Sequence, residues 1–373
     1  MGSIYIHIPF CASKCSYCDF YSVANQALIS EFLPTLLIEI ERRKDVFAKQ
    51  KIETIYFGGG TPSLLSANQI QIILDNIYST YDVIENPEIS LEANPEDLSL
   101  DYLINLCKTD VNRLSIGLQS LDNELLKLMR RRHNSEIALK SVIDAFNLGF
   151  TNISLDLIYG ITGLSTSDWK KHLEIVLNLP ITHLSAYHLG IEEGTLLNRK
   201  LKEGLFKIID ENTSFEHYQT LLEISKNYGF EQYEISNFSK SGFKSKHNSA
   251  YWTEAEYLGF GPSAHSYFGG KRFWNVANVK EYMTKINNNS DVFEFEILSD
   301  TDKFNEKIML GLRTTKGLDL KIIESIFGEK HQQNLLKRLK LVNPQNYVLK
   351  ESVLSLTPAG MFVSNSIMEK LFE

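Results

Sequence analysis

The sequence predicts an α/β protein: a partial (β/α)6 TIM-like barrel followed by a C-terminal, mainly helical, winged-helix-like domain. Two observations lead to this prediction. In the first 240 residues, short apolar runs alternate with amphipathic patterns, which is the signature of βα units around a parallel sheet. From about residue 300 onward, helical patterns dominate and a hairpin follows them. We therefore expect a barrel over residues 1–240, a Gly- and aromatic-rich linking segment over 241–299, and the helical domain over 300–373.

Six runs rich in Ile, Leu, Val and aromatic residues are the predicted strands. Most are too apolar to expose one face to solvent, so we expect buried parallel strands. Six βα units in unbroken succession favour a partial barrel over an open, doubly wound sheet. The predicted strands are residues 4–8, 54–57, 88–92, 113–118, 152–159 and 183–189.

Amphipathic patterns lie between and after these strands. Asn134 and Ser167 are suitable N-cap residues, and Gly149 is a suitable helix stop. Residues 241–275 are expected to form a loop, because glycines and aromatic side chains are dense there. A last helix is expected from Pro358. The other predicted elements are helices over residues 31–43, 67–78, 135–148, 168–177, 302–312, 321–327 and 333–339, and a hairpin over 347–356.

The composition is that of a folded protein, with 43% apolar and 23% charged residues among 373, so a disordered chain and a fibrous repeat are excluded. The net charge of −8 argues against broad nucleic-acid binding, which depends on an excess of Lys and Arg. No apolar run is long enough to cross a bilayer, and no signal peptide precedes the first predicted strand. We therefore expect a cytoplasmic protein without a transmembrane segment.

Three of the four cysteines lie in one stretch, CASKCSYCDF, directly after the first predicted strand. The spacing of Cys11, Cys15 and Cys18 places three thiols at the carboxyl edge of the sheet, where the active sites of α/β proteins gather. Three thiolates can bind three irons of a [4Fe–4S] cluster and leave the fourth iron open. A zinc site and unrelated free thiols are the alternatives, but zinc sites usually have a second C-x2-C pair, which the chain lacks. Cys107 is expected to be a buried structural thiol.

Polar residues also occupy the later strands or follow them. In YFGGGTPS, three glycines let a ligand approach backbone N–H groups closely, although a plain turn is the alternative. Glu92 ends the third strand, where a carboxylate can bind an ammonium group. Gln119 ends the fourth strand, and its amide can bind hydroxyl groups. Asp156 lies in an otherwise apolar strand, and a buried carboxylate needs a partner.

The stretch IHIPFCASKCSYCDF resembles the cluster loop of the radical S-adenosylmethionine superfamily. From residue 4 to the C-terminus, the chain is similar to oxygen-independent coproporphyrinogen III oxidases and to heme chaperones of the HemW type. The resemblance implies a [4Fe–4S] cluster on the three cysteines, with the amine and carboxylate of S-adenosyl-L-methionine on its open iron. Arg131, in RRRHN, matches the arginine that holds this carboxylate, whereas by itself it would equally suit a solvated basic surface. The implied cofactor contacts are Tyr5, Gly59, Gly60, Thr61, Glu92, Gln119, Arg131 and Asp156.

Residues 246–270, KHNSAYWTEAEYLGFGPSAHSYFGG, contain two histidines, His247 and His265, among several aromatic residues. Histidine can bind heme iron, and aromatic side chains can stack on a porphyrin. The pattern HN-x-x-YW is typical of the HemW branch, which makes His247 a candidate heme contact. A histidine next to a tryptophan is otherwise more often a hydrogen-bonded packing residue.

Phe20 distinguishes two functions that the resemblance implies. Enzymes of the oxidase branch usually have a fourth cysteine at this position, so Phe20 favours a heme chaperone that passes heme to respiratory hemoproteins. The alternative is an oxygen-independent coproporphyrinogen III oxidase, in which a 5′-deoxyadenosyl radical abstracts hydrogen from a propionate and CO2 leaves. A third interpretation is a regulatory metal-binding module that acts through its winged-helix-like tail, which a single bound zinc without iron or sulfide would favour. No catalytic side chain is assigned, and a homodimer is left open.

Overall fold

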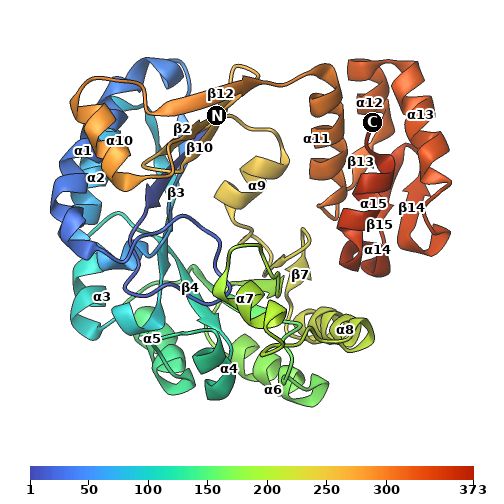
Figure 1. The fold of residues 1–373 in the computed structure, drawn as a ribbon, viewed down its shortest axis with the longest axis horizontal. Coiled ribbons are helices and arrows are strands. Elements are labelled where there is room, and N and C mark those ends of the chain that lie inside the picture. The colour runs from blue at the N-terminus through green and yellow to red at the C-terminus, as the bar shows by residue number, and fades with distance from the viewer.

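The computed structural model describes residues 1–373, and one twelve-stranded sheet organises most of them (Figure 1). Its spatial order is β12-β11-β10-β9-β1-β2-β3-β4-β5-β6-β8-β7. Strands β1 to β6 follow chain order and are all parallel, without the reversal of a doubly wound sheet. The outer strands β1 and β6 pair with β9 and β8 and not with each other. The six parallel strands therefore form a barrel that does not close. The predicted α/β fold is confirmed.

The six parallel strands agree closely with the predicted runs. In β1, Ile4, Ile6 and Ile8 are fully buried in the main hydrophobic core. Tyr5 alternates with them and faces the inside of the partial barrel, where its ring stacks on Tyr56. The bounds are β1 (Gly2–Ile8), β2 (Ile52–Gly59), β3 (Val83–Ala93), β4 (Arg113–Gln119), β5 (Ile153–Tyr159) and β6 (His183–His188).

Helices surround the outer face of these strands (Figure 1). Asn134 caps α5 as predicted, because its side chain accepts from the Ile137 N–H at 2.9 Å, and Gly149 follows that helix with φ +106°. Ser165 rather than Ser167 caps α6, by accepting from the Asp168 N–H. The helices are α1 (Ile29–Arg42), α2 (Ala67–Thr80), α3 (Leu100–Leu106), α4 (Asn123–Leu128), α5 (Ser135–Asn147), α6 (Thr166–Leu177), α7 (Leu196–Lys202) and α8 (Glu211–Asn227).

The expectation that residues 241–275 form a loop is wrong. They contain one helix and three short strands, and β9 pairs in parallel with β1. Gly259 lies inside β9 because a Cβ atom there would come within 2.1 Å of the His265 carbonyl oxygen. Such short strands with a central glycine leave too few residues for a strand pattern to be visible. The elements are α9 (Lys246–Trp252), β9 (Tyr257–Phe260), β10 (His265–Phe268), β11 (Lys271–Asn275), α10 (Val279–Asn287) and β12 (Phe293–Ile297), with β7 (Glu231–Gln232) and β8 (Asn237–Ser239) at the opposite edge.

The C-terminal residues form a mainly helical domain beside the barrel, as predicted (Figure 1). Its small sheet has the order β13-β15-β14, and the predicted hairpin is β14 and β15. The last predicted helix is divided into α14 and α15. The elements are α11 (Asp300–Leu312), β13 (Leu318–Asp319), α12 (Leu320–Phe327), α13 (Glu329–Leu339), β14 (Tyr347–Lys350), β15 (Val353–Leu356), α14 (Pro358–Phe362) and α15 (Ser364–Leu371). The division of the chain at residues 240 and 300 stays a prediction.

Cys107, expected to be buried, is exposed at the C-cap of α3. It directly follows Leu106, which takes the buried side of the short helix. None of the helices has both the length and the apolar character needed to cross a membrane.

Candidate functional site

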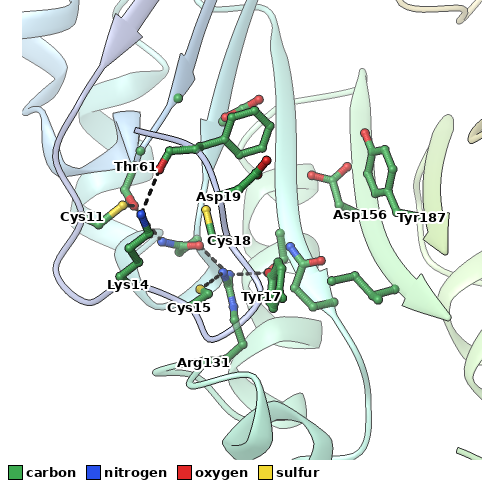
Figure 2. Close-up of a pocket in the computed structure, with 18 of the residues that line it drawn as sticks. Cys11, Lys14, Cys15, Tyr17, Cys18, Asp19, Thr61, Arg131, Asp156 and Tyr187 are labelled. Carbon is green, nitrogen blue, oxygen red and sulfur yellow. Dashed lines mark hydrogen bonds between the residues drawn. The ribbon is translucent and has the colours of Figure 1, made fainter. Parts of the chain in front are cut away.

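A cavity of about 490 Å³ opens at the carboxyl ends of the parallel strands. Figure 2 shows the three cysteines of the loop and Arg131 on one side, with Asp156 across from them. Ten of the twelve residues that the sequence singled out line this first cavity, and Tyr5 and His247 do not. The ten are Cys11, Cys15, Cys18, Gly59, Gly60, Thr61, Glu92, Gln119, Arg131 and Asp156.

The cysteine loop has little regular structure, but hydrogen bonds fasten it to distant parts of the chain. The hydroxyl of Ser16 donates to the Leu128 carbonyl at 2.9 Å, at the end of α4. The N–H of Leu197, in α7, donates to the Ser16 carbonyl at 2.7 Å. The N–H of Cys11 donates to the Val23 carbonyl at 3.0 Å. The loop is therefore held in place at its start and in its middle, which fixes where its thiols lie.

The three thiols of the loop are free, and two of them accept hydrogen bonds from polar side chains. Thr61 Oγ1 lies 3.4 Å from the Cys11 sulfur, and an Arg131 Nη1–H donates to the Cys15 sulfur at 3.4 Å. Burial raises the pKa of Cys18 to about 11, so its thiolate needs a nearby positive charge such as a metal centre. No three His, Cys, Asp or Glu side chains lie close enough together to hold a single metal ion. The donors fit a larger iron–sulfur cluster, in which each cysteine binds a different iron.

The glycines at the end of β2 make room for the cysteine loop. A Cβ atom on Gly60 would lie 2.6 Å from the Phe10 carbonyl oxygen, in the backbone that leads into the loop. Gly59 has φ +105°, and a Cβ atom there would lie 2.6 Å from the His7 ring. The three-glycine motif therefore packs β1 and its loop tightly against the end of β2, in addition to lining the cavity.

The three arginines of RRRHN point in different directions. Arg130 has φ +58° and is exposed. Arg132 points outward and pairs with Glu96 and Asp97 at 3.0 and 2.9 Å. Arg131 points into the cavity, where its Nη2 donates to the Gly117 carbonyl at 2.7 Å, while its buried Nε–H has no partner. A buried guanidinium without a carboxylate partner is suited to binding a carboxylate ligand.

Gln119 adopts an unusual backbone conformation at the end of β4. Its φ is +65°, and the pairing of β4 with β5 shifts register between Gly117 and Gln119. A Cβ atom on Gly117 would lie 2.9 Å from the Gln119 amide nitrogen and 3.2 Å from Arg131 Nη2. Glycine at position 117 therefore allows both polar side chains to enter the cavity.

Two partly buried carboxyl groups face the cavity without an ion-pair partner. Glu92 Oε1 accepts from the Tyr56 hydroxyl at 2.8 Å, and burial raises the pKa of Glu92 to about 7. Asp156 Oδ1 accepts from the Ser115 hydroxyl at 3.2 Å, and burial raises the pKa of Asp156. Removal from water disfavours the charged form of each group. A ligand that brings an ammonium group or hydroxyl donors would satisfy both carboxylates.

Tyr5 and His247 lie outside this cavity. The Tyr5 hydroxyl bonds to His7 Nδ1 at 3.2 Å. His247 is buried at the start of α9, with Nδ1 2.7 Å from Thr54 Oγ1 and Nε2 3.0 Å from the Tyr251 hydroxyl. Burial lowers the pKa of His247 to about 3. The structure places His247 as a packing residue, with neither ring nitrogen open to a heme iron.

Several lining residues were missed by the sequence analysis. Asn94 accepts from Arg131 Nη2, and it belongs to the same LEANPED segment as Glu92. The two-residue period of a strand places Asn94 on the face of Glu92, so alternation was the available signal. Tyr187, near the end of β6, also lines the cavity, and no motif in the sequence indicated it.

Comparisons with known proteins agree with this geometry. Residues 5–176 match the Radical SAM superfamily, and residues 298–363 match the HemN C-terminal domain. The chain is 34% identical to the heme chaperone HemW of Lactococcus lactis, over 99% of this chain and 97% of that protein. It is also 34% identical to the heme chaperone HemW of Bacillus subtilis, over 98% of each. The solved structure of coproporphyrinogen III oxidase (HemN) from Escherichia coli, a radical SAM enzyme, has a TM-score of 0.85 and 22% identity, covering 100% of this chain and 90% of that one. At that identity, the likeness shows the fold.

Proposed function

This chain belongs to the radical SAM superfamily and, within it, to the HemW family, and on that basis we propose that it is a heme chaperone with a [4Fe–4S] cluster and an S-adenosyl-L-methionine site. The observation that carries the proposal is its similarity to proteins named as heme chaperones over 97% and 98% of their length. The proposed cargo is heme, the proposed acceptors are respiratory hemoproteins, and the proposed location is the cytoplasm.

In this proposal, Cys11, Cys15 and Cys18 hold the cluster through their thiolates. When bound, a [4Fe–4S] cluster supplies an electron and one open iron for a ligand. Thr61 and Arg131 donate to two of the thiol sulfurs, and such donors stabilise negative charge on sulfur.

The remaining side chains of the first cavity are proposed to bind S-adenosyl-L-methionine. Arg131 would donate to its carboxylate, and Glu92 would accept from its ammonium group, because opposite charges compensate each other in a buried site. Gln119 and Asp156 would bind the ribose hydroxyls. Gly59 and Gly60 would expose backbone groups beside the amino-acid end of the cofactor.

A heme titration tests the chaperone proposal. Heme is added under anaerobic conditions to protein with a reconstituted cluster, and the Soret absorption is followed. We expect a saturable band with a stoichiometry of about one heme per chain, as a single specific site requires. A band that rises without saturation, as for heme adsorbed to surfaces, would overturn the proposal.

The second candidate is an oxygen-independent coproporphyrinogen III oxidase, favoured by the fold shared with HemN. The oxidase branch that the chain resembles usually has a fourth cysteine where this chain has Phe20, whose side chain is 64% exposed. An anaerobic assay with coproporphyrinogen III, S-adenosyl-L-methionine and a reductant distinguishes the two functions. We expect no protoporphyrinogen, and its formation together with CO2 would establish the oxidase instead.

A further inference from the structure

A second cavity, of about 380 Å³, lies next to the first. Asp19 and Phe20, at the end of the cysteine loop, line both cavities and therefore separate them. The walls of the second cavity include four tyrosine rings, and no Lys or Arg lines it. Flat aromatic walls suit a planar macrocycle.

Two histidines line the second cavity, and only one of them has free ring nitrogens. His7 Nε2 donates to the Tyr21 carbonyl at 3.0 Å, so Nδ1 accepts from the Tyr5 hydroxyl. His265 makes no side-chain hydrogen bond, and its side chain is exposed. An imidazole without a hydrogen-bond partner has a ring nitrogen lone pair available for a metal.

The strand that carries His265 is held firmly. His265 begins β10 and pairs with Trp274 of β11. Its neighbour Ser266 is buried, accepts from the Gly259 N–H at 2.9 Å and also accepts from Arg43 Nη2 at 3.0 Å. A ligand on such a strand has a fixed position, as metal ligands need.

The HN-x-x-YW pattern contributes to this cavity through its tyrosine. Tyr251 lines the cavity, and its hydroxyl bonds to the buried His247. Its ring packs edge-on against Tyr257, with 4.7 Å between centroids. His247 therefore acts on the cavity wall as a positioning residue, through Tyr251.

We propose that the second cavity binds the heme and that His265 is the axial ligand of its iron. The bond forms by donation of an imidazole lone pair to the iron and involves no electron transfer. This inference rests on the proposed function, because it assumes that heme is the cargo. A single protein ligand with an exposed side chain also leaves the heme accessible to an acceptor.

The test compares His265→Ala with His247→Ala, and His172→Ala on the outer helix α6 serves as the matched control. Ferric heme is titrated into each reconstituted protein, and the Soret band and the electron paramagnetic resonance spectrum are recorded. We expect His265→Ala to weaken heme binding about tenfold or more and to lose the histidine-ligated signature. Added imidazole should restore that signature. His247→Ala should weaken binding but keep the signature, and His172→Ala should match the wild type.

Each outcome has one meaning. If His265→Ala keeps the wild-type affinity and spectrum, the proposal is wrong although heme is still bound. If His247→Ala loses the signature while His265→Ala keeps it, the ligand is His247 and the proposal is wrong. If the wild type shows no saturable binding, the proposed function itself fails. Iron and sulfide content equal to that of the wild type shows that His265→Ala is folded, and His265→Tyr should shift the spectrum rather than abolish it.

Discussion

The two cavities differ in chemistry although one loop borders both. The first has three thiols, a guanidinium without an ion pair and two partly buried carboxyl groups. The second has tyrosine rings, one free imidazole and no cationic side chain. A cavity of the first kind suits a charged, polar cofactor, and one of the second kind suits a flat, largely apolar macrocycle. Under the proposed function, the two adjacent cavities would bind the cofactor and the cargo separately.

The largest expected effect comes from removing a cysteine of the first cavity. Cys15→Ala removes one of the three thiols, and the reconstituted protein should lose nearly all of its iron and sulfide, because a cluster with two protein ligands is poorly held. Cys107→Ala is the matched control, since Cys107 is exposed and outside both cavities. Iron analysis and the visible absorption spectrum measure the outcome. Equal losses in the two variants would contradict the assigned ligands.

A pH experiment tests the burial of Glu92. Its pKa is raised from 4.5 to about 7 in the folded protein, so its contribution to stability is complete below pH 4.5 and is lost as the pH rises through 7. Between pH 5 and 8, the unliganded wild type should lose up to about 3 kcal/mol relative to Glu92→Gln. Urea unfolding at both pH values measures this difference, and parallel pH curves for the two proteins would show that Glu92 does not titrate in this range.

Variants of two neighbouring arginines distinguish an effect inside the first cavity from an effect of surface charge. Arg131→Gln removes a guanidinium that faces the first cavity, and the Kd for S-adenosyl-L-methionine should rise about thirtyfold, which corresponds to about 2 kcal/mol. Arg132→Gln breaks only outward ion pairs, so its effect should stay within about twofold. Anaerobic calorimetry gives both constants. A comparable effect of the two changes would mean that Arg131 acts through general charge.

The smallest expected effect comes from a change at Phe20, which lies between the two cavities. Phe20→Ala shortens an exposed side chain, so stability should change by less than about 0.5 kcal/mol. Heme affinity should fall about threefold, which is below 1 kcal/mol, while S-adenosyl-L-methionine affinity stays unchanged. Titrations with each ligand test this, and a loss confined to the cofactor would place Phe20 with the first cavity.

The sequence was informative where a pattern is local and periodic. The parallel strands were found because runs such as residues 153–159 are apolar on both faces, and Cys11, Cys15 and Cys18 were found because their spacing is short. It was uninformative where long-range packing decides. The strand around Gly259 is four residues long and depends on its approach to His265.

The roles of the two histidines depended on contacts far apart in the chain. The sequence favours His247 over His265, because only His247 lies in the HN-x-x-YW pattern. In the structure, both ring nitrogens of His247 are hydrogen-bonded, to Thr54 and Tyr251. The ring of His265 has no such partner. Similarly, the inward direction of Arg131 depends on its contact with Gly117, which spacing alone does not reveal.

The end of α4 has a practical consequence for handling the protein. Ser16 of the cysteine loop donates hydrogen bonds to the carbonyl groups of Leu128 and Met129 there. Arg131 lies two residues after Met129. If the proposed cluster is bound, its oxidative loss in air should loosen the cysteine loop and its attachment to α4, and thereby change the direction of the Arg131 side chain. The cofactor affinity measured on protein purified in air should then be too low. Adding excess cofactor should not correct this, whereas restoring the metal should.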